Sequence, residues 1–96
     1  MSTRPQKLTD DAVANELANL DGWALENGQI AKQYTFKTYK DGVVFAVAVA
    51  QYADREDHHP DLYIGYAKVR VALNTHDVGG ISSLDFKLAH LIEGII

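Results

Sequence analysis

The sequence predicts an α+β fold, in which three helices cover one face of a four-stranded antiparallel sheet. Apolar residues recur at helical spacing near both ends of the chain, and short alternating segments occur in two pairs. A long, unbroken apolar segment separates the two pairs. The resulting order is α-β-β-α-β-β-α, and two hairpins joined through a long helix are typical of a single sheet with helices on one side.

Length and composition limit the classes of protein to which the chain can belong. With 96 residues, the chain predicts one domain, residues 1–96, because so short a chain cannot form two cores. The net charge of −4 disfavours direct binding of nucleic acid, which usually requires a basic surface. The absence of cysteine excludes disulfides, thiolate metal sites and a cysteine nucleophile.

Two further features concern location and assembly. Residues 1–7 are polar, contain Pro5 and are predicted to form a loose N-terminal arm. They lack the apolar stretch of a signal peptide, and no apolar run reaches the roughly 20 residues of a membrane span. A cytoplasmic protein without membrane contact is therefore expected, and its small core makes self-association a plausible source of additional stability.

The first helix is predicted directly after the arm. Thr9 is a favoured N-cap residue, and Asp10 and Asp11 place negative charge in the first turn, where the helix dipole stabilises it. The dipeptide Asp21-Gly22 is expected to end the helix. Its apolar stripe consists of Ala12, Val13, Leu17 and Leu20.

A hairpin is predicted next. The dipeptide Asn27-Gly28 stands between residues 23–26 and residues 30–37, and Asn-Gly between two apolar-patterned runs is a strong hairpin signal. In the second run Ile30, Tyr34 and Phe36 fall on one face of a strand.

The apolar segment that follows allows two interpretations. Residues 43–50 are rich in valine, which favours a buried strand. However, nothing breaks the chain over roughly 17 residues from Asp41 to Asp57, and strands rarely exceed about 10 residues. Length and the charged residues at its end therefore predict a helix, with Pro60 as its stop signal.

The remainder of the chain predicts a second hairpin and a last helix. Alternating residues in 62–66 and 69–74 predict two strands, joined tightly near residues 66–68. Gly79-Gly80 breaks the chain, and Ser82 begins the helix. The apolar stripe of this helix consists of Leu84, Leu88, Leu91, Ile92 and Ile95.

Candidate chemistry is concentrated in the histidines. His58 and His59 directly precede Pro60, and His76 follows the last predicted strand. Metal binding, a cap or surface role, and proton transfer are all compatible with these residues. Metal binding is disfavoured because the side chains of adjacent residues diverge. His90, inside the last helix, is interpreted as an exposed helix residue that points away from Asp85.

Asp85 also has two interpretations. The pattern Ser82-x-x-Asp85 matches a helix capping box, in which the aspartate accepts from the backbone of the serine. An aspartate at this place is also suited to orient a nearby histidine and to stabilise its charge, although capping is the favoured interpretation from the pattern alone. No serine or cysteine stands in a nucleophile motif, so proton transfer is the remaining chemistry for the histidines.

Taken together, these residues resemble the signature of the pterin-4a-carbinolamine dehydratases. Asp54-x3-His58-His59-Pro60 is followed at the family's spacing by Tyr66, His76 and Asp85. The likeness extends from about Trp23 to the end of the chain. It departs from many relatives in one respect, because Asp61-Leu62-Tyr63 stands where they carry a tryptophan shortly after His-His-Pro.

The resemblance implies a function and a site. It implies a hydro-lyase that removes water from 4a-hydroxytetrahydropterin in tetrahydrobiopterin recycling, without a metal or other cofactor, and that assembles as a homodimer or homotetramer. The implied catalytic residues are His58, His59, His76 and Asp85. The implied substrate-binding residues are Asp57, His58, His59, Asn74, Thr75, His76 and Asp77.

Within this implied site we expect His58 and His76 to share the acid and base roles. His59 would hold the pterin and Asp85 would orient a histidine. The resemblance also leaves two alternatives. One is a non-enzymatic dimerisation cofactor or assembly scaffold on the same fold, with a protein partner. The other is an enzyme of this fold that acts on a different pterin, such as one from molybdenum-cofactor metabolism.

Overall fold

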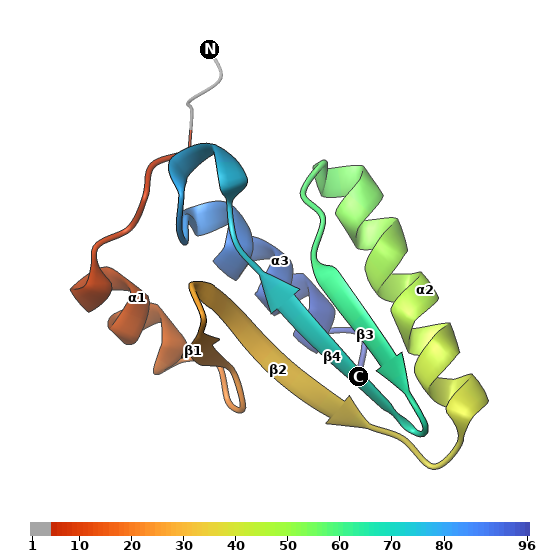
Figure 1. Cartoon of the computed structure of the whole chain (residues 1–96). Coiled ribbons are helices and arrows are strands. Elements are labelled where there is room, and N and C mark those ends of the chain that lie inside the picture. The colour runs from red at the N-terminus through yellow and green to blue at the C-terminus, as the bar shows by residue number, and fades with distance from the viewer. Residues whose placement is uncertain (1–4) are drawn as a thin grey trace.

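The computed structural model describes residues 5–96 and has the predicted order of elements (Figure 1). Its sheet has the strand order β1-β2-β4-β3, and every neighbouring pair is antiparallel. The predicted α+β class and four-stranded antiparallel sheet are confirmed. The elements are α1 Asp10–Leu17, β1 Ala24–Glu26, β2 Gln29–Thr35, α2 Tyr39–Glu56, β3 Asp61–Gly65, β4 Lys68–Leu73, a 3-10 turn His76–Val78, and α3 Ser83–Glu93.

All three helices pack on the same face of the sheet. In the register of β2 and β4, Ile30 lies opposite Leu73 and Tyr34 opposite Val69, so these residues share one face. They are buried in one cluster with residues of α1, α2 and α3, whereas the other face carries exposed side chains such as Tyr63 and Lys68. Figure 1 shows α3 behind β2 and β4, α1 beside β1, and α2 alongside β3.

The predicted arm falls partly outside the described residues, because the structure describes the chain only from Pro5. The amide of Leu8 donates a hydrogen bond to the carbonyl of Ile81 at 2.8 Å. This bond links the segment before α1 to the segment that leads into α3.

The first half of the chain contains the predicted helix and hairpin, but the ends of these elements differ from the prediction. Thr9 caps α1, and its hydroxyl accepts from the amide of Ala12 at 3.1 Å. The helix ends at Leu17 rather than near Gly22, and Leu20 is buried from the turn that follows. Phe36 lies beyond the end of β2, yet it packs against the core as expected.

The ambiguous apolar segment is helical. Burial recurs every four residues, at Phe45, Val49 and Ala53, whereas Val44 and Val47 are 59% and 56% exposed. A strand would instead have buried alternate residues. The helix begins earlier than predicted because Thr38 caps it, accepting from the amide of Asp41 at 3.1 Å.

The prediction that Pro60 ends α2 is wrong. Asp57, and not Pro60, ends the helix, because Asp57 adopts the left-handed conformation with φ of 51°. The amide of His58 then donates to the carbonyl of Ala53 at 3.1 Å, which closes a Schellman-type cap. The start of α3 is as predicted, with Ser82 as its N-cap, but its buried face includes Phe86 and Ala89, which the predicted stripe omitted.

A partly buried polar cluster fastens the end of α3 to β2. The Glu93 carboxylate accepts from Lys32 Nζ at 3.0 Å and from the hydroxyl of Tyr34. Burial acts to raise the pKa of Glu93, but the bonds from Tyr34 and Lys32 outweigh it, so the pKa is lowered from 4.5. The pKa of Tyr34 is raised, first by burial and then by the Glu93 carboxylate, so the phenol stays protonated and donates.

Replacing Glu93 by glutamine is expected to destabilise the protein by about 1–2 kcal/mol at neutral pH. Because the folded-state pKa of Glu93 lies below its unfolded value, its stabilising contribution is complete above pH 4.5 and is lost as the pH falls through the folded pKa. Urea denaturation of the parent protein and of Glu93→Gln, at pH 7 and at pH 3, gives the loss of stability at each pH. The matched control is Glu16→Gln, an exposed position on α1. An equal loss for Glu93→Gln at both pH values would contradict the explanation.

Among the described helices, none has both the length and the apolarity needed to cross a bilayer.

Candidate functional site

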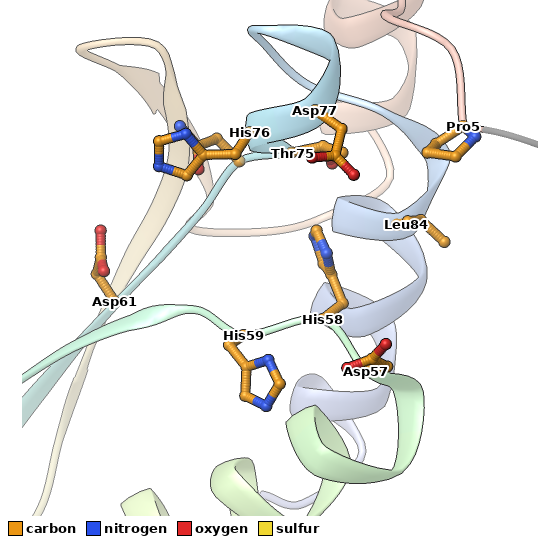
Figure 2. Close-up of a pocket in the computed structure, with 10 residues that line it drawn as sticks. Pro5, Asp57, His58, His59, Asp61, Thr75, His76, Asp77 and Leu84 are labelled. Carbon is orange, nitrogen blue, oxygen red and sulfur yellow. The ribbon is translucent and has the colours of Figure 1, made fainter.

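A cavity of about 350 Å³ opens where the ends of four elements meet (Figure 2). One wall comes from the chain between α2 and β3, and the other comes from the end of β4 and the 3-10 turn that follows it. The start of α3 and the N-terminal segment complete the lining. The lining residues are Pro5, Asp57, His58, His59, Asp61, Asn74, Thr75, His76, Asp77 and Leu84.

The structure therefore brings both predicted segments to one cavity. All seven residues predicted to bind substrate line it. Asp85, the remaining predicted catalytic residue, does not line the cavity but contacts His58. His90 is exposed on α3 and lies in a different groove, as expected for a helix histidine outside the site.

His58 is the most enclosed of the three cavity histidines. The Schellman-type cap at the end of α2 fixes its backbone, and its side chain is only 11% exposed. Its Nε2 lies 2.6 Å from Oδ1 of Asp85, whose side chain is fully buried. This short contact between two enclosed groups fixes the orientation of the imidazole.

Asp85 makes the contacts that both of its interpretations require. Its Oδ2 accepts from the backbone amide of Ser82 at 2.9 Å, which is half of the capping box. The same oxygen accepts from the hydroxyl of Thr75 at 2.8 Å. Oδ1 is left to face His58. The capping bond therefore helps to orient the carboxylate toward the histidine.

The tautomer of His58 is assigned from this arrangement, with Asp85 as a carboxylate. An ionised carboxylate accepts hydrogen bonds only, so Nε2 of His58 carries the hydrogen toward Asp85. Nδ1 is then the nitrogen that takes or gives a proton. Within residues 5–96, Nδ1 of His58 has no hydrogen-bond partner. It is not fully buried, and because His58 lines the cavity, Nδ1 is accessible from that side.

The other two imidazoles are more exposed. Nε2 of His59 bonds Oδ1 of Asp54 at 3.0 Å, and the His59 side chain is 58% exposed. His76 begins the 3-10 turn and is also exposed. Figure 2 shows the ring of His58 directed toward the Thr75–Asp77 segment, that of His59 directed away from it, and that of His76 on the side of Asp61.

Three lining residues were not predicted. Asp61, at the start of β3, accepts from the side-chain amide of Gln29 at 3.0 Å. Its position directly after His-His-Pro was a usable signal, because a fixed turn carries the following carboxylate to the same cavity. Leu84 was assigned only to the helix stripe, and nothing in the sequence pointed to Pro5.

The polar lining differs from a metal centre. In the part of the chain that the structure describes, no three histidine, aspartate or glutamate side chains gather in a way that could hold a metal ion. The cavity instead combines imidazoles with the carboxylates of Asp57, Asp61 and Asp77. It therefore offers groups that exchange protons near neutral pH beside acceptors for N–H donors.

Comparison with known proteins gives consistent results. A family model described as "Pterin 4 alpha carbinolamine dehydratase" matches residues 6–95. A relative from Aquifex aeolicus, "Putative pterin-4-alpha-carbinolamine dehydratase", is 38% identical over 95% of this chain and 92% of its own length. A relative of the same name from Sulfurisphaera tokodaii is 42% identical over 95% and 98%.

Two solved structures share the fold. The crystal structure of a "transcriptional coactivator/pterin dehydratase" from Brucella melitensis matches with a TM-score of 0.88 and 34% identity, over 94% of this chain and 98% of that one. A "pterin dehydratase-like protein" described as a RuBisCO assembly factor in the alpha-carboxysome matches with a TM-score of 0.61 and 18% identity, over 76% and 84%. At that identity the second match supports the fold alone.

Proposed function

The chain belongs to the pterin-4a-carbinolamine dehydratase family, and we propose that it removes water from 4a-hydroxytetrahydrobiopterin at the cavity around His58 and His76. The observation that carries this proposal is the meeting of imidazoles from two separate chain segments around one cavity of about 350 Å³. A cavity of this size falls at the lower end of the range for small-molecule sites.

The reaction requires one acid and one base. The substrate carries a hydroxyl on C4a beside N5–H. The N5 lone pair forms the C4a=N5 double bond as the C4a–O bond breaks, and an acid protonates the departing hydroxyl, which leaves as water. A base then removes the proton from N5, and the quinonoid dihydropterin results. Imidazoles exchange protons near neutral pH and are suited to both steps.

We assign the two proton transfers to His58 and His76, on opposite walls of the cavity. Asp85 supports the role of His58, because its buried carboxylate stabilises the imidazolium that forms when Nδ1 takes a proton. His59, held by Asp54 and half-exposed, contributes to holding the pterin at the rim. The carboxylates of Asp57, Asp61 and Asp77 are suited to accept from the N–H groups of the pterin ring, while Asn74 and Thr75 complete the wall.

The direct test of this function uses the purified protein. A pterin-dependent hydroxylase generates 4a-hydroxytetrahydrobiopterin, and ultraviolet absorbance follows its conversion to the quinonoid product. We expect micromolar protein to accelerate this conversion well above the spontaneous decay. Unchanged decay would overturn the proposal and would favour a scaffold role for the same fold.

We also propose that the protein acts in the cytoplasm as a homo-oligomer, either a dimer or a tetramer. Val44 and Val47 expose apolar surface one turn apart on α2, and Ile64 on the edge strand β3 is 40% exposed. Exposed apolar side chains on a helix and on an edge strand favour contact with another copy.

Light scattering coupled to size exclusion is expected to give a mass of at least twice the 10.6 kDa of one chain. The substitution Val47→Lys is expected to lower that mass or to weaken the association, because it places a charge within the exposed apolar surface. A single species of 10.6 kDa at all concentrations would contradict self-association.

A further inference from the structure

Thr75 lies at the centre of a buried chain of hydrogen bonds, and their directions follow from the carboxylate of Asp85. Its side chain is 4% exposed, and its hydroxyl lies 2.8 Å from Oδ2 of Asp85 and 2.7 Å from the hydroxyl of Ser82. Because the carboxylate only accepts, the hydroxyl hydrogen of Thr75 points to Asp85. Thr75 must then accept from Ser82, whose own oxygen accepts from the amide of Leu84 at 3.2 Å.

These directions place the donors from Thr75 and Ser82 on the carboxylate oxygen of Asp85 that does not face His58. Oδ2 receives the Thr75 hydroxyl and the Ser82 amide, and Oδ1 receives Nε2 of His58. Successive bonds that point the same way polarise one another. Rotation of the carboxylate would break two buried bonds, so the hydroxyl of Thr75 helps to fix the orientation of the group that holds His58.

The backbone of Thr75 also forms hydrogen bonds, which hold the loop of His76. Its amide donates to the carbonyl of Gly80 at 2.8 Å, and its carbonyl accepts from the amide of Val78 at 3.1 Å. These bonds close the loop that carries His76, the next residue in the chain. A single residue therefore fastens the loop of His76 through its backbone and the partner of His58 through its side chain.

We propose that Thr75 is a positioning residue that sets His58 relative to His76, and that its hydroxyl does not bind substrate. The hydroxyl donates its only hydrogen to Asp85 and accepts from Ser82, so it offers the pterin no hydrogen. This inference rests on the proposed dehydratase function. It revises the role of Thr75 from a substrate-binding residue to a support for the imidazole.

The test compares Thr75→Val, which keeps the shape and removes the hydroxyl, with Thr75→Ser, which restores it. We expect Thr75→Val to lower kcat by about 10–100-fold with little change in KM, the range seen when the hydrogen-bond partner behind a metal-binding histidine is removed. Thr75→Ser should recover most of kcat. The matched control, Thr35→Val on the exposed face of β2, should leave both constants unchanged.

A second readout does not depend on turnover. The proton between Nε2 of His58 and Asp85 is expected to give a far-downfield NMR signal at low temperature. The signal should be present in the parent protein, Thr75→Ser and Thr35→Val, and shifted or lost in Thr75→Val. If the parent protein lacks dehydratase activity, the proposed function fails, whereas this signal still reports whether Thr75 holds the pair.

Two results would overturn the positioning role. One is an unchanged His58 signal together with unchanged kcat in Thr75→Val. The other is a raised KM at constant kcat, which would mean that the hydroxyl binds substrate. If Thr75→Val does not fold, Thr75→Ala provides the same comparison, because it also removes the hydroxyl that donates to Asp85 and leaves the Ser82 amide bonded to Oδ2.

Discussion

Replacing His58 by alanine is expected to slow dehydration by about 10²–10⁴ while the protein remains folded. The substitution removes the most enclosed imidazole of the cavity and leaves Asp85 without the group that it orients. His76→Ala should produce a loss in the same range, because each imidazole serves one of the two proton transfers. Stopped-flow measurement of carbinolamine breakdown gives both rates, after subtraction of the spontaneous reaction.

The control for both variants is His90→Ala. This histidine is exposed on α3 and lies outside the cavity, so its loss should leave the rate near that of the parent protein. Thermal unfolding of each variant separates loss of chemistry from loss of fold. Nearly full activity in both His58→Ala and His76→Ala would mean that the proton transfers are assigned to the wrong residues.

The second large effect is expected for Asp85→Asn, which changes the tautomer of His58 rather than removing the ring. The amide of Ser82 and the hydroxyl of Thr75 both donate to Oδ2, so the carbonyl oxygen of the new amide should take that place. Its NH2 group then faces Nε2 of His58 and forces that nitrogen to accept. The hydrogen of the neutral ring then lies on Nδ1. Nδ1, which takes a proton in the parent protein, can no longer do so.

A rate loss of about 10²–10⁴ is expected for this variant, comparable to the effect of the same change beside a catalytic histidine in serine proteases. Stability should fall little, because the contacts of the carbonyl oxygen with Ser82 and Thr75 persist. The deciding measurement is the dehydration rate of Asp85→Asn and of the parent protein across the pH range, with thermal unfolding measured in parallel. A variant that dehydrates at the parent rate would show that the tautomer of His58 does not matter.

The fold was largely predictable because its local signals agree with one another. Thr9 and Ser82 are helix caps that the sequence predicts. Asn27-Gly28 forms the turn of the first hairpin, with positive φ at both residues. Where propensity and length disagreed, over α2, the length of the segment decided correctly for a helix. The ends of elements were harder, since the left-handed cap at Asp57 depends on the backbone and not on a breaker residue.

Most of the residues that line the cavity were predictable from the sequence, but their contacts were not. His58 and His76 lie on different chain segments, and only the family resemblance joined them before the structure was known. The cap role of Asp85 follows from local spacing, but its contact with His58 crosses 27 positions and depends on how α3 packs beside α2. The orientation of His59 toward Asp54 was not predicted either, because side-chain direction in a turn depends on tertiary packing.

A crystal structure with a stable dihydropterin bound tests the central claim most directly. We expect the bicyclic ring in the cavity between α2 and the 3-10 turn, with the C4a–N5 edge within hydrogen-bond reach of Nδ1 of His58 and of the ring of His76. The ring should leave the bond between His58 and Asp85 intact. A pterin seated elsewhere, for example in the groove lined by Gln51, Tyr52 and Ile95, would contradict the proposed site and its chemistry.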